Sequence, residues 1–488
     1  MNKISKKSTI SLVELPPTQF GILNGEPGYD IYSHIKIPAR AIHVLEGVLK
    51  ADGWENVESI NPLFHGERRK LSGGNFSRIF SSDILGISAI TRTSQQSIEL
   101  ARRYKEANPK GIIIFGGSDS KFRAVEYIEG GADIVVMGEG EKTIKKVMER
   151  LEMSADLSDV DGIAFRANGK LTIAKPAELM SPDELSQLPH PYYDKKVRDG
   201  VHTAVVETSR GCPHNCNFCS VTMNYGSRYR TKSIEYSAEE FGRTKDMGSL
   251  YFISDDNFAG NRKHTKELLE QLIERGITRS KKNLHVQITA KAAKDSELLG
   301  LMKKAGVSTV YIGFESIVDA SLDDMGKASN ATENKDAASI FRDFGFWVHG
   351  MLVPGTDSDT PETLKETLSW AKKSLDSVQF FPLTPLPGTP LMHKMKEEKR
   401  ILTDDLSLYD AQHVVIMPKK FTPYQLQRQV YDMYEEFYSV SESAKRLFRA
   451  PQKKNAFKIM AYALSNGIKS ILYNKQSVQH LEFLKSVS

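Results

Sequence analysis

Apolar runs of strand length alternate with helical patterns along the second half of the chain. The runs occupy residues 202–209, 249–258, 284–292, 307–316, 345–355 and 377–391, and intervening segments such as 264–276 follow the helical repeat. Strands that alternate with helices of this length predict parallel βαβ units. Six such units predict a partial (β/α)6 barrel of the TIM-like kind, whose chemistry belongs at the carboxyl ends of the strands.

The first 150 residues follow a related pattern with glycine-rich loops. Residues 81–93, 101–120 and 131–151 each combine an apolar strand with polar or glycine positions and a neighbouring helical pattern. This arrangement predicts a Rossmann-like, doubly wound α/β domain that binds its ligand outside the carboxyl ends of the strands. We expect this domain at 1–150, a linker at 151–195, the barrel at 196–400 and a mostly helical, basic region at 401–488.

Composition changes this picture little. The chain has 488 residues, of which 40% are apolar and 26% charged, and no run approaches the ~18 apolar residues of a membrane span. The basic start lacks the apolar block of a secretory signal. Three clustered cysteines cannot form a disulfide framework, so we expect a cytoplasmic protein.

The net charge of +5 hides a basic C-terminal segment. Residues 441–488 contain nine Lys or Arg residues but only Glu442 and Glu482 as acids. Its apolar positions approach a helical stripe, and we expect this segment to pack on the rest of the chain with its lysines in water. An anionic membrane or an acidic protein are the alternatives for a basic amphipathic helix, and no nucleic-acid partner is expected.

All the cysteines lie within eight positions, at Cys212, Cys216 and Cys219. Thiolates suit zinc or iron–sulfur clusters. Structural zinc requires four protein ligands, and although His214 could be the fourth, the spacing differs from paired C-x-x-C knuckles. A four-iron cluster requires one ligand per iron, so three thiolates leave one iron open to a substrate.

The pattern C-x-x-x-C-x-x-C, with the aromatic Phe218 just before the last cysteine, resembles the signature of radical S-adenosylmethionine enzymes. The resemblance implies that the three thiolates hold a [4Fe–4S] cluster whose open iron is chelated by the amine and carboxylate of S-adenosyl-L-methionine. It further implies cleavage to a 5′-deoxyadenosyl radical by an electron from an external donor such as flavodoxin or ferredoxin.

The same resemblance implies a set of residues that bind S-adenosylmethionine. Asp255 and Asp256 match the contact with its amino group, although Asp256 or Asn257 could instead cap the next helix. Glu315 and Ser316 match the strand-four motif that contacts the ribose or methionyl part. The full set expected at this cofactor is Phe218, Asp255, Asp256, Glu315, Ser316 and Gly350.

The N-terminal pattern resembles the cobalamin-binding domain of one large subfamily of these enzymes. The loops expected to contact the corrin contain Ser88, Gly116, Gly117, Ser118, Gly138 and Glu139, whose alternative role is turn chemistry and capping. Some cobalamin proteins ligate cobalt with the histidine of D-x-H-x-x-G. None of His34, His43 and His65 lies in such a motif, so we expect cobalamin to bind without that histidine, and the alternative is a domain that has lost cobalamin binding.

These resemblances together imply a cobalamin-dependent radical C-methyltransferase. Its radical removes hydrogen from an unactivated carbon, which then takes a methyl group from methylcobalamin. The substrate classes implied are a protein side chain, such as a glutamine of methyl-coenzyme M reductase, a lipid, or a natural product. The alternatives are a ring-forming enzyme resembling the anaerobic magnesium-protoporphyrin ester cyclase, a lipid-modifying radical enzyme, and a non-catalytic cluster-bearing scaffold.

Overall fold

The computed structural model describes residues 3–16, 19, 36–67, 69–167, 169–277, 283–464 and 467–488. These residues divide into two compact units. The first contains residues 3–16, 36–202 and 246–248, and the second contains 203–245 and the described residues from 249 onward.

The first unit is built on a single sheet with the strand order β2-β1-β3-β4-β5-β6-β7. The strands β2, β1, β3, β4 and β5 are parallel to one another, whereas β6 and β7 are added in antiparallel orientation at one edge. The strands are β1 (Thr9–Glu14), β2 (Asn56–Ile60), β3 (Ile84–Ser88), β4 (Ile112–Gly116), β5 (Ile134–Val136), β6 (Ile163–Ala167) and β7 (Lys170–Ile173). The helices are α1 (Arg40–Ala51), α2 (Pro62–His65), α3 (Gly73–Ser81), α4 (Ser94–Ala107), α5 (Ala124–Glu129), α6 (Gly140–Glu152), α7 (Pro182–Ser186) and α8 (Lys195–Gly200).

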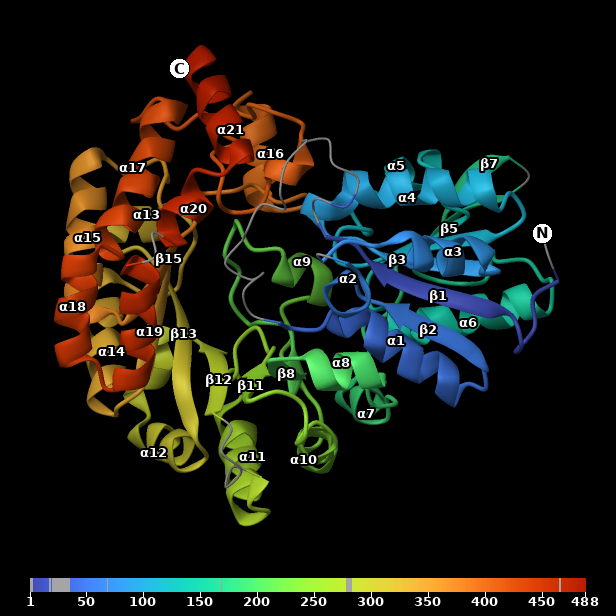
Figure 1. The fold of residues 1–488 in the computed structure, drawn as a ribbon, viewed down its shortest axis with the longest axis horizontal. Helices are drawn as coiled ribbons and strands as arrows, with labels where there is room; N and C mark the ends of the chain where they lie inside the picture. Colours follow the sequence, from blue (N-terminus) through green and yellow to red (C-terminus); the bar gives the residue numbers. More distant parts are fainter. Residues whose placement is uncertain are drawn as a thin grey trace. The chain divides into compact units, whose positions relative to one another are not determined.

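Apolar cores cover both faces of this sheet. Ile112 and Ile114 of β4 belong to the core shared with α1 and α6, whereas Ile113 and Phe115 belong to the core shared with α4 and α5. Successive residues of a strand point to opposite faces, so a strand buried on both sides is apolar throughout. The predicted doubly wound, Rossmann-like architecture is therefore confirmed, and Figure 1 shows helices on both sides of the sheet.

Parts of this sheet were not predicted from the sequence. Strands β1 and β2 mix polar with apolar positions, with Ser11 in β1 and Glu58 and Ser59 in β2, so their apolar signal is weak. Strands β6 and β7 lie within residues 151–195, for which we expected a linker, and they extend the sheet as a hairpin.

The second unit contains a parallel sheet with the order β15-β14-β13-β12-β11-β8 among its described residues. All six apolar runs predicted as strands form β8 (Thr203–Val206), β11 (Leu250–Ile253), β12 (Asn283–Ile288), β13 (Val307–Glu315), β14 (Trp347–Leu352) and β15 (Ser377–Phe380). The main helices that follow them are α10 (Ile234–Arg243), α11 (Arg262–Glu274), α12 (Ser296–Lys304), α14 (Ala331–Asp343), α15 (Pro361–Ser374) and α17 (Pro423–Phe437). Figure 1 shows these helices outside a curved sheet, as expected for the partial barrel.

Alternation along the strands distinguishes the two faces of the barrel. On β13, Val310, Ile312 and Phe314 are completely buried, whereas Tyr311 and Gly313 between them are partly exposed. The buried set faces the helices because successive side chains alternate across a strand. The inner face of the barrel therefore carries the partly exposed residues.

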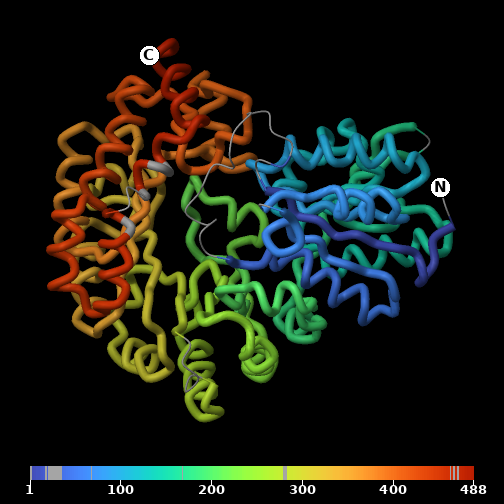
Figure 2. Tube along the Cα trace, in the orientation of Figure 1, coloured from blue at the N-terminus to red at the C-terminus, as the bar shows by residue number. Residues whose placement is uncertain are grey.

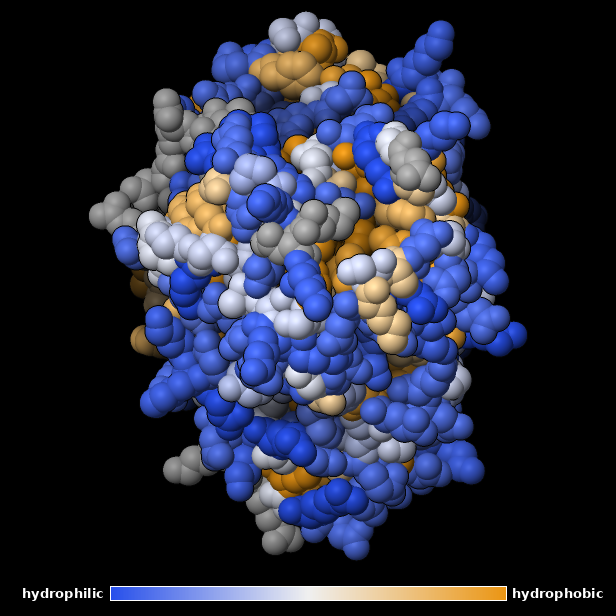
Figure 3. All heavy atoms as spheres, turned by 90° about the vertical axis from the view of Figure 1, so that its right-hand side faces the viewer, coloured by the Kyte–Doolittle hydropathy of each residue, from blue (hydrophilic) through white to orange (hydrophobic). Residues whose placement is uncertain are grey.

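No helix within the described residues is long and apolar enough to span a membrane. The face shown in Figure 3 is covered mainly by hydrophilic residues, with hydrophobic residues in smaller patches.

The basic C-terminal region is helical, as predicted. It contains α18 (Val440–Arg449), α19 (Lys453–Leu464), α20 (Gly467–Leu472) and α21 (Lys475–Ser486). Ala450 and Ala456 are buried against Trp347, at the amino end of β14. In Figure 2 the red C-terminal segment lies beside the yellow and orange segments of the barrel. This contact supports the expected packing of the segment on the chain.

The Ala456 contact can be tested by substitution. Ala456→Asp places a charge where the side chain is 1% exposed, so we expect a stability loss of ~1–3 kcal/mol and a lower thermal unfolding midpoint. Ala461→Asp, at an exposed position of the same helix, is the matched control and should leave the midpoint nearly unchanged. Equal midpoints for the two variants would show that α19 does not pack on the barrel.

Candidate active site

The three cysteines lie in one loop that follows β8, at the carboxyl edge of the barrel sheet. Cys216 is 9% exposed, and Cys212 and Cys219 are partly exposed. The loop begins at Gly211, whose φ is 86° and whose added Cβ would lie 2.5 Å from the carbonyl oxygen of Arg228. Glycine is therefore required there on both conformational and steric grounds.

Asp255, at the end of β11, fixes the start of this loop. Its carboxylate is completely buried and accepts hydrogen bonds from the backbone N–H and the hydroxyl of both Thr208 and Ser209. Burial raises the pKa of Asp255 to about 6, although these four donors oppose the rise, so the group is ionised at neutral pH. We expected Asp255 at the cofactor, but its carboxylate binds Thr208 and Ser209 of the protein itself.

Asp256 has a different environment. Its carboxylate accepts one hydrogen bond from the backbone N–H of Gly211, at 3.2 Å, and the residue is partly exposed. Burial raises its pKa to about 6, again leaving it ionised at neutral pH. The helix that follows begins at Arg262 and is capped by Asn261, so neither Asp256 nor Asn257 caps it.

Buried charged side chains stabilise the segment that leads into the cysteine loop. Lys232 is 1% exposed and its ammonium lies 2.8 Å from the Glu207 carboxylate, which also accepts from the Arg210 guanidinium. Arg210 belongs to β9 (Ser209–Arg210), which pairs with β10 (Arg230–Thr231). These contacts fix the position of the segment that runs from Thr208 and Ser209, which bind Asp255, to Cys212.

Asn217 ties the middle of the loop to two distant segments. Its backbone N–H donates to the Met325 carbonyl at 3.1 Å, and its side-chain amide donates to the Asp324 carbonyl at 2.7 Å. Its own carbonyl accepts from the Leu391 N–H at 3.0 Å. Phe218 packs against the same region, in a core with Leu322 and Met325.

Glu315 and Ser316 lie at the carboxyl end of β13. Glu315 has a φ of 62°, and its Oε1 accepts from the Lys327 ammonium at 2.8 Å. Ser316 is 4% exposed, and its hydroxyl oxygen accepts from the Val318 N–H. Gly350 faces the helices, where an added Cβ would lie 2.4 Å from the Leu375 side chain. The cofactor contacts predicted for these three residues stay predictions.

The thiols fit a site for a metal cluster. Burial raises the pKa of all three, to about 12 for Cys219, whereas the Lys327 charge lowers the pKa of Cys212 and Cys216. A coordinated metal ion supplies the positive charge that keeps such a thiol deprotonated. No three His, Cys, Asp or Glu side chains in the described ranges come together around one point as ligands of a single ion do. Ligands of a four-iron cluster instead bind separate irons.

Polar and aromatic side chains share the inner face of the barrel. Gln287, Tyr311, His349 and Ser377 occupy one row of paired positions across β12 to β15. The rings of Tyr311 and His349 lie 4.7 Å apart, and the His349 nitrogens bond to Ser377 and Gln379. Burial lowers the pKa of His349 to about 4, so the imidazole is neutral at physiological pH.

In the first unit, the residues expected at cobalamin lie at the carboxyl ends of three adjacent strands. Ser88 ends β3, Gly116 ends β4 with Gly117 and Ser118 after it, and Gly138 and Glu139 follow β5. No heavy atom lies within 4 Å of a Cβ added at Gly116 or Gly138, so both loops border open space.

Protein contacts already engage some of these residues. The Ser88 hydroxyl donates to Glu14 at 3.1 Å, and the Glu139 carboxylate accepts from the Met180 N–H at 2.8 Å. A Cβ at Gly117 would lie 2.2 Å from the Ala89 carbonyl oxygen, so this glycine is required for packing. Glu14, at the end of β1, was not predicted from the sequence.

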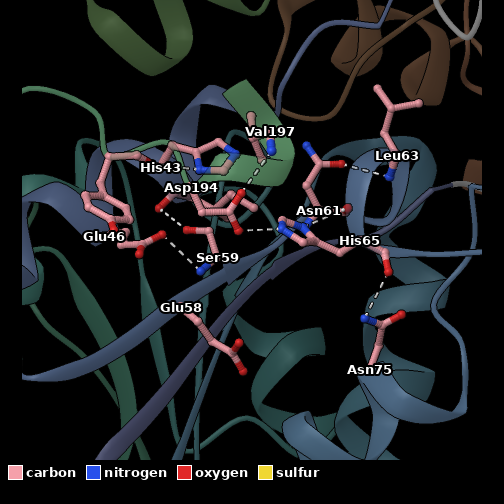
Figure 4. Close-up of polar contacts among 12 residues, drawn as sticks. His43, Glu46, Glu58, Ser59, Asn61, Leu63, His65, Asn75, Asp194 and Val197 are labelled. Carbon is pink, nitrogen blue, oxygen red and sulfur yellow. Dashed lines mark hydrogen bonds and ion pairs between the residues drawn. The ribbon is translucent and has the colours of Figure 1, made fainter. Parts of the chain in front are cut away.

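His43 and His65, the described histidines before the linker, are engaged in contacts with the protein (Figure 4). His65 accepts the Asn61 N–H at Nδ1, and its Nε2 lies 2.7 Å from the Asp194 carboxylate. His43 is 1% exposed and its Nδ1 contacts the Tyr192 carbonyl. His34 lies outside the described residues. These contacts support cobalamin binding without His43 or His65, which stays a prediction.

Comparisons with known proteins agree with this geometry. The family model of the radical SAM superfamily matches residues 206–371, and that of the B12 binding domain matches residues 36–148. Both families were expected from the sequence, and the matches confirm the predicted S-adenosylmethionine, iron–sulfur and cobalamin cofactors.

Two curated relatives extend over most of the chain. An uncharacterised methyltransferase of Pyrococcus horikoshii is 30% identical over 74% of this chain and 79% of its own length. The anaerobic magnesium-protoporphyrin IX monomethyl ester cyclase of Cereibacter sphaeroides is 26% identical over 86% of this chain and 69% of its own.

Among solved structures, the cobalamin-dependent S-adenosylmethionine radical enzyme OxsB has the same fold. It superposes with a TM-score of 0.70 over 98% of this chain and 75% of its own, at 16% identity. The cysteine loop on the barrel, the B12-binding unit and the curated relatives lead to one conclusion. The chain belongs to the radical S-adenosylmethionine superfamily, among the enzymes that also carry a B12-binding domain.

Proposed function

We propose that the protein transfers a methyl group to an unactivated carbon. The observation that carries this proposal is the presence, in one chain, of a three-cysteine loop on a parallel barrel and a B12-binding unit. When bound, S-adenosylmethionine with its cluster supplies a hydrogen-abstracting radical, and cobalamin supplies the methyl group. The protein's own residues bind these groups, orient the acceptor and exclude water.

Cys212, Cys216 and Cys219 would hold the cluster, and Asp256 would accept a hydrogen bond from the amino group of S-adenosylmethionine. The Asp256 carboxylate is ionised, partly exposed and bonded to Gly211, the residue before Cys212. The N–H groups of an iron-bound amine need a hydrogen-bond acceptor when they are buried. In our proposal Asp255 instead holds the loop, because its oxygens already accept four hydrogen bonds.

The inner face of the barrel supports an acceptor that carries polar groups beside the reacting carbon. Gln287, Tyr311, His349 and Gln379 offer amide, hydroxyl and imidazole groups there. Polar groups that line a site fix the orientation of a ligand by bonding to its polar atoms, and a hydrocarbon acceptor has none. An amide side chain, such as the glutamine of methyl-coenzyme M reductase, therefore suits this face better than an unfunctionalised lipid chain.

Ring formation is the second candidate function. It is favoured by the 26% identity with the magnesium-protoporphyrin ester cyclase of Cereibacter sphaeroides. The two reactions differ in the product mass. Methylation adds one CH2 unit to the acceptor, whereas oxidative ring closure removes hydrogen.

The first test measures the reaction. Reduced, cofactor-loaded protein should convert S-adenosylmethionine to 5′-deoxyadenosine and add one CH2 unit to a glutamine-containing peptide, as read by mass spectrometry. Cys216→Ala should abolish both products, because it removes a cluster ligand, whereas the neighbouring Ser220→Ala should retain them. A product lighter by hydrogen, without added CH2, would instead support the ring-forming reaction.

The second test separates the roles of the two aspartates. Asp256→Asn should retain iron but bind S-adenosylmethionine at least about tenfold more weakly, since a charge-assisted hydrogen bond contributes ~1.5–3 kcal/mol. Asp255→Asn should lose iron, because the amide group opposes the Thr208 and Ser209 donors with a donor of its own. Iron content and equilibrium dialysis provide the two readings, with the exposed Asp336→Asn as control. Retained iron in Asp255→Asn would contradict the assigned roles.

The third test concerns cobalamin. Gly116→Leu adds a side chain at the end of β4 without a clash inside the protein, since the space around it is open. We expect an unchanged unfolding midpoint but an affinity for hydroxocobalamin at least about tenfold lower, because the leucine fills the space proposed for the corrin. Gly74→Leu, which also projects into open space, should bind normally. Equal affinity in both variants would place the corrin elsewhere.

A further inference from the structure

A buried ion pair between Lys327 and Glu315 lies beside the cysteine loop. The Lys327 Nζ is 2.8 Å from the Glu315 Oε1, and the two side chains are 15% and 10% exposed. Removing two charges from water costs several kcal/mol per ion, and such a pair is often no more stable than an apolar substitute. A contribution to folding stability alone is therefore a weak explanation for the presence of this ion pair.

The backbone around the pair is adapted to it. A Cβ added at Gly313 would lie 2.4 Å from the Glu315 Oε1 and 3.3 Å from the Lys327 Nζ. Glu315 itself has a left-handed φ of 62°, which is a strained conformation for a non-glycine residue. The surroundings thus hold both charges at the carboxyl end of β13 despite a local conformational cost.

The turn that carries Lys327 is joined to the cysteine loop. This turn follows α13 (Asp319–Asp324), and the Lys327 N–H donates to the Leu322 carbonyl at 2.9 Å. Asn217 of the cysteine loop donates to the carbonyls of Asp324 and Met325, as described above. A Cβ added at Gly326, the residue before Lys327, would lie 3.6 Å from the Asn215 carbonyl oxygen, so this turn packs directly on the loop beside Cys216.

A charge in this position affects the one-electron reduction of the cluster. Three thiolates leave the cluster site negatively charged, and reduction adds another negative charge. A nearby cation stabilises the reduced state more than the oxidised one, and burial strengthens the effect. Local charge is among the factors that set the potential of such clusters.

We propose that the Lys327 ammonium raises the reduction potential of the cluster and that the Glu315 carboxylate partly offsets it. The inference rests on the cluster bound by the cysteine loop and does not depend on which acceptor is methylated. It assigns Lys327 an electrostatic role, distinct from those of the cysteines that bind iron.

A redox titration monitored by electron paramagnetic resonance tests this inference on full-length, reconstituted protein without S-adenosylmethionine. In Lys327→Met, the equilibrium between reduced and oxidised cluster should shift about tenfold toward the oxidised form, which is about 59 mV for one electron. Glu315→Gln should shift it in the opposite direction. The double variant should return close to the wild type, since it removes both charges.

Lys327→Arg, which keeps the charge, and Lys335→Met, an exposed lysine on α14, are the matched controls and should stay near the wild-type potential. If Lys327→Met retains too little iron, the difference between Glu315→Gln and the double variant supplies the same quantity. A structural role for Lys327 would reduce iron content and leave the potential of the remaining clusters unchanged. That outcome, or shifts of equal sign in the two single variants, would overturn the inference.

Discussion

The Asp255 carboxylate is the contact on which the geometry of the site depends. It joins the end of β11 to Thr208 and Ser209 after β8, two segments that meet only in the folded barrel. Its four hydrogen bonds fix the direction in which the chain leaves β8, and hence where Gly211 and the three cysteines lie. A buried carboxylate that lost these donors would be strongly destabilising, so the contact resists substitution.

Much of the fold follows from local patterns in the sequence. The six barrel strands are apolar runs bounded by polar residues, and β3, β4 and β5 are buried on both faces. Strands β1 and β2 escaped prediction because strands with interspersed polar positions give little periodic signal. The antiparallel β6 and β7 were missed because the pairing of β6 with β5 depends on tertiary contact.

The cofactors of the site were predictable from the sequence, whereas the residues that support the cysteine loop were less so. The number and spacing of the cysteines, with their resemblance to the radical S-adenosylmethionine signature, indicated an iron–sulfur cluster. The sequence could not separate Asp255 from Asp256, which are neighbours yet lie in different environments. Lys327 and Asn217 carried no recognisable signal either, because their partners Glu315 and Met325 are defined only once the chain has folded.

The construction of the cysteine loop has a consequence for the order of assembly. Its three thiols are close in sequence, so bringing them together closes only a short loop and costs little chain entropy. The contacts that shape the loop instead reach Asp255, Met325 and Leu391, over large separations in sequence. Long-range contacts are slow to form because a large loop must first be closed. The final shape of the loop therefore depends on the folded barrel, not on the cysteine segment by itself.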